Sequence, residues 1–264
     1  MIKVLKFIAF IFLMLAPLSS LKAAETKELK VGTVPVPHAK ILQLIAPDLK
    51  KQGINLKIIE FNDNGLMPNI ALNDGSIDAN YFQHVPFYQS QAKDRKYDFI
   101  NVGEVHIEPI ALYSKKLKNI SELRKGAVIA VPSDPSNYAR ALILLHNNGI
   151  ITLKDPNNFT ATKYDIAKNP KKIEIKTVDG PLLVRTLSDV DGAVINGNYA
   201  MQGGLSSKDV ILREDSKSKY GNCVFVRKGD ENRPEIKALV NALRSEKVKK
   251  YLKETYNDEV IPAF

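Results

Sequence analysis

The stretch from residue 127 to 149 reads AVIAVPSDPSNYARALILLHNNG and contains the unit that decides the fold. Its first five residues are apolar, which is typical of a strand buried on both faces. A loop with Pro132 and Pro135 follows. Asn137–Asn147 then carries apolar residues at helical spacing, and Gly149 favours the end of that helix. A buried strand that opens through a short loop into a helix is typical of parallel α/β layers.

The same order of elements opens the chain. Glu28–Thr33 predicts a strand, Val34–His38 predicts a proline-interrupted loop, and Ala39–Gln52 predicts a helix that ends at Gly53. Short or alternating apolar runs predict further strands at Asn55–Phe61, Phe99–Val105, Ile110–Ser114, Ile173–Val178, Gly192–Ile195 and Val224–Arg227. Helical spacing predicts helices at Pro68–Leu72, Pro86–Lys93, Pro181–Leu187 and Pro234–Tyr256.

These elements predict an α/β protein with two lobes. We expect residues 24–109 together with 223–264 to form the first lobe, and residues 110–222 to form the second. The chain would then cross between the lobes twice, near Pro109 and near Asn222. Because ligands bind at the carboxyl ends of parallel strands, we expect a ligand cleft between the lobes.

Residues 1–23 predict an export signal. Two lysines precede Phe7–Leu21, an uncharged run of 15 residues, and small residues follow it. The run is shorter than the about 20 residues that span a bilayer comfortably. We expect cleavage after Ala23, with cleavage after Ala24 as the competing choice and a retained membrane anchor as the alternative.

The only cysteine of the sequence is Cys223, and its position matters more than its number. One cysteine excludes a disulfide scaffold and a multi-cysteine zinc module. A lipid anchor would need a cysteine at the cleavage point, so we expect a periplasmic protein without one.

The charge and the absence of several motifs exclude other classes. The formal net charge is +9, from 38 Lys and Arg against 29 Asp and Glu, and it falls to +6 without the three lysines of residues 1–23. The remaining basic residues are dispersed among acids, so we expect no nucleic-acid partner. No Walker, dinucleotide-binding or nucleophile-elbow motif occurs, so we expect no enzyme. We expect no metal or cofactor either, because no close ligand spacing joins His38, His84, His106 and His146.

Six stretches in collinear order carry a resemblance to a known family. They read VGTVPVPHAKIL, GLMPNIALNDGSIDANYFQHVPFYQ, GEVHIEPIALYSKK, VPSDPSNYARALILL, DVDGAVINGNYA and YGNCVFVRKGD. The sequence resembles the NlpA-type family, the methionine-binding substrate-capture proteins of ABC importers, over nearly the whole mature chain. The resemblance implies a two-lobed periplasmic-binding-protein fold of type II-like form. It also implies a free amino acid as ligand and an ABC permease and ATPase as partners, with membrane contact only through the permease or a retained signal.

The polar end of such a ligand needs a cation, hydrogen-bond donors and acceptors. Arg140 lies in the first turn of a predicted helix, where it and Asn137 could hold a carboxylate beside free backbone N–H groups. Asn198 follows a buried strand, and its amide could serve either end of an amino acid, with Asn196 as a further candidate. Asn222 aligns with an asparagine that the family uses at the ligand's polar end. The alternatives are a helix cap at Asn137, a surface charge at Arg140 and plain turn residues elsewhere.

Aromatic residues supply candidates for the side-chain slot. Phe82, His84 and Phe87, with Tyr88 beside them, form a possible wall. Each aromatic contact with a thioether sulfur contributes about 0.3–1.5 kcal/mol, which would favour methionine over leucine. The alternative is an aromatic stripe that belongs to the core.

One position departs from the family pattern. After Phe61-Asn62-Asp63 the family usually has tyrosine lining the slot, whereas this chain has Asn64 followed by Gly65. The change would widen the pocket or shift its preference toward a methionine-containing dipeptide or a more polar amino acid. Two hypotheses follow: capture of L-methionine or a close relative for import, and, as the alternative, a surface or periplasmic interaction protein without a transport role.

Overall fold

The computed structural model describes residues 26–215 and 218–264 of the 264-residue chain. The predicted export signal, residues 1–23, lies outside the described residues. None of the helices in the described part combines the length and the apolar character needed to span a bilayer.

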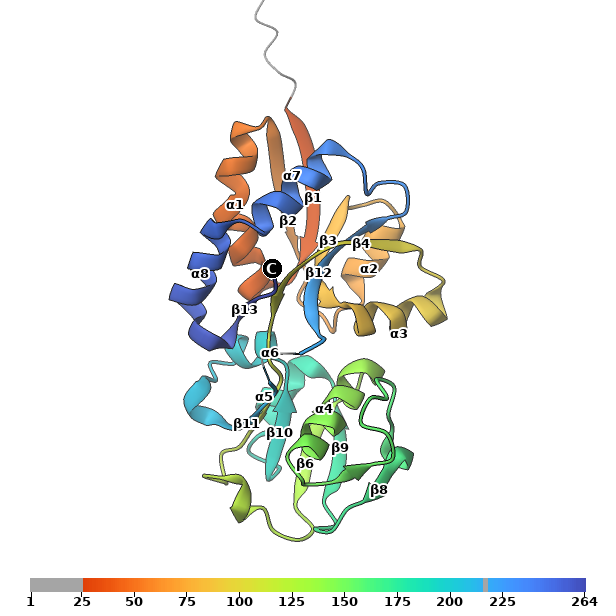
Figure 1. Cartoon of the computed structure of the whole chain (residues 1–264), viewed down its shortest axis with the longest axis vertical. Helices are drawn as coiled ribbons and strands as arrows, with labels where there is room; N and C mark the ends of the chain where they lie inside the picture. The colour runs from red at the N-terminus through yellow and green to blue at the C-terminus, as the bar shows by residue number, and fades with distance from the viewer. Residues whose placement is uncertain (1–25, 216–217) are drawn as a thin grey trace, which may run out of the picture.

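The first lobe is built on a six-stranded sheet that takes strands from both ends of the chain (Figure 1). Its strand order is β13-β4-β12-β3-β1-β2. The strands are β1 (Lys27–Thr33), β2 (Ile54–Glu60), β3 (Ala79–His84), β4 (Phe99–Ile107), β12 (Gly221–Arg227) and β13 (Ile261–Pro262). The helices are α1 (Lys40–Lys51), α2 (Met67–Asn73), α3 (Val85–Arg95), α7 (Pro234–Leu243) and α8 (Glu246–Tyr256).

The second lobe is built on a five-stranded sheet from the middle of the chain. Its strand order is β11-β5-β10-β6-β9. The strands are β5 (Ala111–Tyr113), β6 (Val128–Pro132), β9 (Glu174–Val178), β10 (Gly192–Ile195) and β11 (Val210–Arg213), with a separate pair of β7 (Thr152–Leu153) and β8 (Ile166–Lys168). The helices are α4 (Pro135–Asn147), α5 (Leu183–Thr186) and α6 (Gly197–Gln202).

The sheets are mixed, which corrects the expectation of parallel layers. The βαβ units are parallel, since β1 pairs with β2 and β3, and β6 pairs with β9 and β10. However, β12 runs antiparallel to β3 and β4, and β5 runs antiparallel to β10 and β11. These antiparallel strands flank the two crossovers, because β4 leads into β5 and β11 leads into β12.

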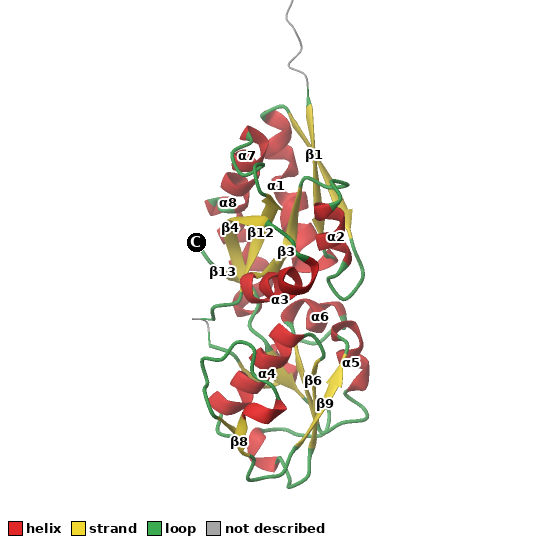
Figure 2. Ribbon diagram, turned by 90° about the vertical axis from the view of Figure 1, so that its right-hand side faces the viewer, coloured by secondary structure: helices red, strands yellow, loops and turns green. Residues whose placement is uncertain are grey.

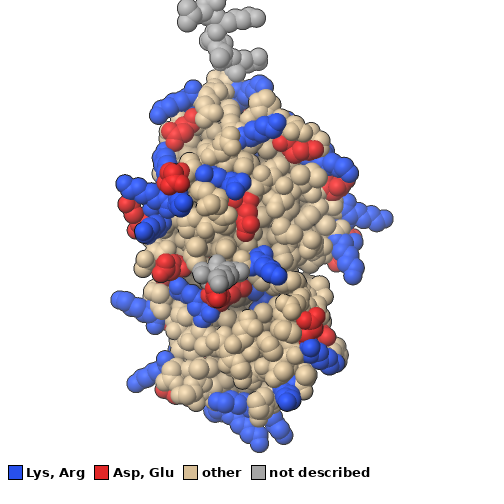
Figure 3. Space-filling view, in the orientation of Figure 1, with Lys and Arg blue, Asp and Glu red and all other residues tan. Residues whose placement is uncertain are grey.

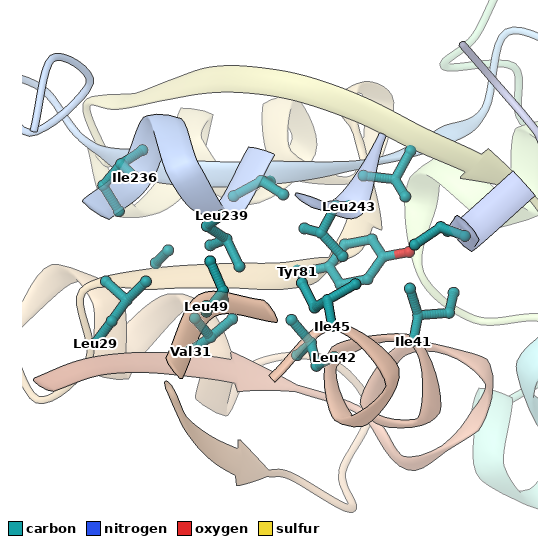
Figure 4. Packing of buried hydrophobic residues seen from close by; sticks show 14 of the residues in the cluster. Leu29, Val31, Ile41, Leu42, Ile45, Leu49, Tyr81, Ile236, Leu239 and Leu243 are labelled. Atoms are coloured by element: carbon teal, nitrogen blue, oxygen red, sulfur yellow. The ribbon is translucent and has the colours of Figure 1, made fainter. Parts of the chain in front are cut away.

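Each lobe has its own apolar core. In the first lobe, α1 covers the sheet with four buried residues at the predicted helical spacing, namely Ile41, Leu42, Ile45 and Leu49 (Figure 4). Burying one such side chain contributes about 1.5–3 kcal/mol relative to leaving it exposed. In the second lobe, Leu142 and Leu145 of α4 pack over Ile129 of β6 in a separate cluster. Each sheet is therefore stabilised by an apolar core of its own.

Two predicted segments differ in detail. Pro234–Tyr256 forms two helices, because the chain leaves helical geometry at Arg244 and Ser245, where the Ser245 hydroxyl accepts from the Val248 N–H. The Val34–His38 loop contains a helical turn, Pro35–Ala39, that is interrupted at Val36. The strands and helices that no pattern predicted are β3, β7, β8, β11, β13 and α6.

The lobes meet where α3 of the first lobe packs against α4 of the second (Figure 2). Charged side chains of both signs are interspersed on the first lobe, whereas basic residues gather at the far tip of the second (Figure 3). The expectation of dispersed basic charge therefore holds for the visible face of the first lobe and not for that tip.

Candidate functional site

A cavity of about 250 Å³ lies between the two lobes. Both lobes contribute to its walls, so a molecule inside contacts the two at once. Of the ten candidates from the sequence, nine line it: Asn64, Phe82, His84, Phe87, Asn137, Arg140, Asn196, Asn198 and Asn222. It is also lined by Val34, His38, Gly65, Leu66, Gln83, Gln91, Glu108, Ser133, Asp134, Pro135, Asp179, Gly180 and Tyr199.

The start of α4 forms the polar part of the second lobe's wall. Asp134 caps this helix, and its Oδ1 accepts from the Asn137 N–H at 2.9 Å. The sequence predicted free backbone N–H groups here, but the Asp134 carboxylate already occupies this one. The amide Nδ2 of Asn137 also donates to Asp134, which leaves Asn137 Oδ1 directed at other partners.

Arg140 is buried, and its charge is already paired. Its Nε donates to the Glu214 carboxylate at 3.1 Å, and its Nη2 donates to the backbone carbonyl of Glu108 at 2.9 Å. The guanidinium also stacks over the Tyr220 ring, with 4.3 Å from Cζ to the centroid. Nη1 takes part in none of these bonds. The surface-charge alternative is excluded, because Arg140 is only 3% exposed.

Asn196, Gly197 and Asn198 start a helix instead of forming a plain turn. The Asn196 Nδ2 donates to Asn137 Oδ1 at 2.8 Å, and this bond fixes both amides on the second lobe's wall. The Asn196 Oδ1 is buried and has no hydrogen-bond partner among the described residues. At Gly197 a Cβ would lie 3.0 Å from Glu108 Cβ, so glycine lets the start of α6 approach Glu108 closely.

His84 joins the two walls. Its Nδ1 accepts from the Phe87 N–H at 3.1 Å, so Nε2 carries the proton and donates to Asn137 Oδ1 of the second lobe at 3.1 Å. Burial lowers the pKa of His84 to about 3, which keeps the ring neutral. The His84 ring thus works as a neutral hydrogen-bond donor across the cleft.

Phe82 and Phe87 form the aromatic part of the first lobe's wall. Their ring centroids lie 6.0 Å apart in an edge-to-face arrangement. Gly65, with φ at +85°, lays its backbone against both rings, because a Cβ there would lie 3.0 Å from Phe87 and 3.2 Å from Phe82. Asn64 directly precedes Gly65 in the same loop and also lines the cavity. It stands at the position at which the family pattern has tyrosine.

Tyr88 does not line the cavity. Its ring packs against Phe225 and stacks on Phe99, and its hydroxyl accepts from the Phe99 N–H at 3.0 Å. The prediction of Tyr88 as a ligand residue is therefore not supported by its position. Tyr88 instead packs in the core, which is the alternative given above for the aromatic residues.

Sequence reasoning missed a buried polar cluster at the cavity floor. Glu108 lies in the crossover between β4 and β5, and its Oε1 is 2.9 Å from His106 Nε2 and 3.4 Å from His38 Nε2. The Tyr81 hydroxyl bonds to His106 Nδ1, and His38 Nε2 lies 3.2 Å from Asn222 Oδ1. The signal that the sequence offered for this cluster was the pair His106 and Glu108, two polar residues among the apolar residues of the stretch VHIEP.

This cluster is also the group of residues that could hold a metal ion. Ligand atoms of His38, His106 and Glu108 lie within 4.8 Å of one another, although their spacing in the sequence gave no sign of it. Each imidazole Nε2 is engaged in a hydrogen bond, whereas the buried Nδ1 of His38 has no hydrogen-bond partner among the described residues.

Two α/β lobes with a polar and aromatic cavity between them define the class of two-lobed substrate-binding proteins. The sequence matches the profile of the NlpA lipoprotein family over residues 29–264. The chain belongs to this family.

Relatives and solved structures agree with this membership. The D-methionine-binding lipoprotein MetQ of Salmonella typhi is 40% identical over 222 residues, which are 83% of this chain and 81% of that protein. A nutrient binding protein from Burkholderia cenocepacia bound to methionine is 44% identical with a TM-score of 0.86, over 89% of this chain and 100% of that chain. A periplasmic substrate-binding protein of an ABC transporter from Coxiella burnetii is 45% identical with a TM-score of 0.85, over 89% and 100%.

Proposed function

We propose that this chain is the periplasmic binding protein of an ABC importer and that it captures methionine or a closely related amino acid. One observation carries the proposal: a cavity between the lobes has amides and an arginine on one wall and two phenylalanine rings on the other. A zwitterion with an apolar side chain matches both walls. The methionine-binding relatives support this proposal over an interaction protein without a transport role, and over an enzyme.

The residue roles follow from the two walls. Arg140 and Asn137 hold the ligand carboxylate, and Arg140 Nη1 is the atom that its internal bonds leave for this purpose. Asn198 and Asn222 bind the polar end, Asn198 from the first turn of α6 and Asn222 from β12 of the six-stranded sheet. Phe82, His84 and Phe87 surround the side chain, with the Asn64 loop above the rings.

Delivery to the membrane completes the proposal. The lobes, residues 24–109 with 223–264 and residues 110–222, close on the ligand, because only the closed state lets it contact both. A permease with its ATPase receives the ligand from this state. We place the protein in the periplasm, although relatives named lipoproteins give no support to the expectation that it has no lipid anchor.

Mass spectrometry of ligand released from freshly purified protein tests the ligand directly. Protein stripped by unfolding and refolding is then titrated calorimetrically with L-methionine, D-methionine, leucine and methionine-containing dipeptides. We expect a methionine enantiomer to bind most tightly. No binding of either enantiomer, with another molecule recovered from the fresh protein, contradicts the methionine assignment.

A further inference from the structure

The floor of the cavity holds a buried carboxylate beside two imidazole rings. The Oε1 atom of Glu108 lies 2.9 Å from His106 Nε2 and 3.4 Å from His38 Nε2. All three side chains are buried: Glu108 is 5% exposed, His106 is 0% exposed and His38 is 1% exposed. Two imidazoles and one carboxylate are the donor set of zinc sites that have three protein ligands and keep a fourth position open.

The distances between these ligand atoms fit a single metal ion. Zinc lies about 2.0–2.2 Å from the nitrogen and oxygen atoms that bind it. Two such atoms are therefore about 2.8–3.6 Å apart when the angle at the metal lies between a right angle and a tetrahedral angle. Both distances from Glu108 Oε1 fall in this range, and the ligand atoms of the three residues lie within 4.8 Å of one another.

The carboxylate of Glu108 has no basic side chain as an ion-pair partner among the described residues. Its ion-pair contacts there are with His38 and His106, whereas Arg140 is paired with Glu214. Buried charges in proteins are paired or coordinate a metal ion, because an unpaired charge loses its hydration without compensation. The floor of the cavity therefore lacks a positive charge next to this carboxylate.

Hydrogen bonding within the protein leaves this cluster incomplete. His38 Nε2 lies 3.2 Å from Asn222 Oδ1 and 3.4 Å from Glu108 Oε1, so a neutral ring has one N–H for two oxygen atoms. The buried His38 Nδ1 has no hydrogen-bond partner in the described part of the chain. A cation bound at Nε2 needs no proton on that atom, and it attracts both oxygen atoms at once.

A further hydrogen bond orients His106 for a metal ion. Its Nδ1 bonds to the hydroxyl of Tyr81, whose ring is held in the apolar cluster of Figure 4. Metal-binding histidines use the ring nitrogen that faces away from the metal for such a bond, which fixes the ring and the position of its proton. With the Nδ1–H donating to the Tyr81 oxygen, the lone pair of Nε2 is directed at the site.

The cluster is open to the cavity on one side. His38, Glu108 and Asn222 line the cavity, whereas His106 and Tyr81 do not line it and are fully buried. We propose that His38, His106 and Glu108 bind one divalent transition-metal ion of the zinc class and leave a coordination position open to the cavity. A water molecule, or an amine or carboxylate of a molecule in the cavity, takes that position. The proposal goes beyond the proposed function, because the ion binds without an amino acid.

Titration of the full chain with Co²⁺ tests the proposal. The protein carries no histidine tag, and unfolding in the presence of a chelator followed by refolding removes bound metal and amino acid. We expect one Co²⁺ per chain, with the visible absorption bands of an ion that has four or five ligands, and displacement of Co²⁺ by Zn²⁺. Mg²⁺ and Ca²⁺ in large excess should not displace it, because they prefer sites built from oxygen atoms. A chain that shows neither cobalt bands nor calorimetric heat with Zn²⁺ overturns the proposal.

Two variants each remove one ligand, and two controls remove the same kind of group elsewhere. Glu108→Gln and His106→Asn should each weaken Co²⁺ binding by more than about 100-fold. Glu60→Gln, at the exposed end of β2, and His146→Gln, in the last turn of α4, should bind Co²⁺ as the unmodified chain does. Co²⁺ binding that both ligand variants retain overturns the proposal.

Tyr81→Phe keeps all three ligands, so it gives a test that does not depend on the stability of the ligand variants. The ring still packs in the core, but His106 Nδ1 loses its bonding partner. Because Tyr81 is a positioning residue, Co²⁺ affinity should fall by about tenfold to 100-fold while the bands return at saturation. Tyr88→Phe, which loses a hydroxyl bonded to the Phe99 N–H, is the control. Equal Co²⁺ affinity of Tyr81→Phe and the unmodified chain would overturn the assignment of His106 as a ligand.

Discussion

The two walls of the cavity are made of different chemistry on different supports. The first lobe's wall has rings, Phe82, His84 and Phe87, on the junction of β3 and α3. The second lobe's wall has amides and a guanidinium, with Asn137 and Arg140 on α4. A strand–helix junction holds rings rigidly, whereas a helix start presents polar groups and the positive end of its dipole.

The difference teaches how one site can separate two tasks. The second lobe recognises what all amino acids share, and the first lobe recognises the side chain. His84 and Asn137 connect the walls through one hydrogen bond of 3.1 Å. If this division is right, variants on the two walls fail in different ways, and the following experiments measure that difference.

The largest effect is expected for Arg140→Met. This change leaves the Glu214 carboxylate without its ion-pair partner and removes the cation of the polar wall. We expect the free energy of unfolding to fall by about 3 kcal/mol and methionine affinity to fall by about 100-fold or more. Urea denaturation and calorimetric titration measure the two losses.

Arg124→Met is the matched control in the same lobe. Arg124 also pairs with a carboxylate, that of Asp191, but the Arg124 side chain is 72% exposed. Its loss should cost less than about 1 kcal/mol of stability and leave affinity unchanged. Equal methionine affinity in Arg140→Met and the unmodified protein would contradict the polar-wall assignment.

Acid should weaken the first lobe before the second. His38, His84 and His106 belong to the first lobe, and burial lowers their pKa values to about 4, 3 and 3. In the unfolded chain they take up protons below about pH 6.5, so the stability that their neutral forms support is present above that pH. It is lost as the pH falls toward 4.

Each histidine should lose about 2 kcal/mol of this stability by pH 5, and the three together about 6 kcal/mol. The raised pKa of the Glu108 carboxyl acts in the opposite direction. Hydrogen exchange of the ligand-free protein at several pH values should show lost protection in β3 and β4 before β6 and β10. Simultaneous loss in both lobes would show that the lobes unfold as one unit.

Periodicity was sufficient to predict the strand–helix units. Ala127–Val131 and the helix after it fold as expected because a buried strand and an amphipathic helix have different spacings. The same patterns gave no direction for β12, whose antiparallel pairing arises because the chain returns from the other lobe. Topology of this kind depends on contacts that are distant in sequence.

The candidate site shows the same limit at the level of side chains. Phe87 and Tyr88 are neighbours in sequence, but successive helical residues point about 100° apart, so Phe87 faces the cavity and Tyr88 the core. His38, His106 and Glu108 come together only through folding. Asn137 and Arg140 were predictable because one helix turn places both near the same helix start.

Asn137→Ala breaks the link between the walls and should have the next smaller effect. Its Oδ1 accepts from Asn196 at 2.8 Å and from His84 at 3.1 Å, so two buried donors lose their acceptor. We expect affinity for methionine to fall by about tenfold to 30-fold. Small-angle X-ray scattering should also show a more open ligand-free protein.

Asn148→Ala is the control for this link. Asn148 follows the same helix at its far end, and its Nδ2 donates to the Leu144 carbonyl away from the cavity. Its loss should reduce stability by about 1 kcal/mol and leave affinity and the scattering profile unchanged. An Asn137→Ala protein that binds normally would mean that the two walls close independently of this bond.

Phe87→Leu is the smallest and most selective change, because it alters only the ring wall. A thioether sulfur loses an aromatic contact worth about 0.3–1.5 kcal/mol, so methionine affinity should fall by about twofold to tenfold. Leucine affinity should change less, so the ratio of the two affinities narrows. Tyr88→Phe is the control, because its hydroxyl bonds to the core backbone and not to the cavity. Equal losses for methionine and leucine would mean that the rings only shape the cavity, and the division of tasks between the walls would then rest on the polar wall alone.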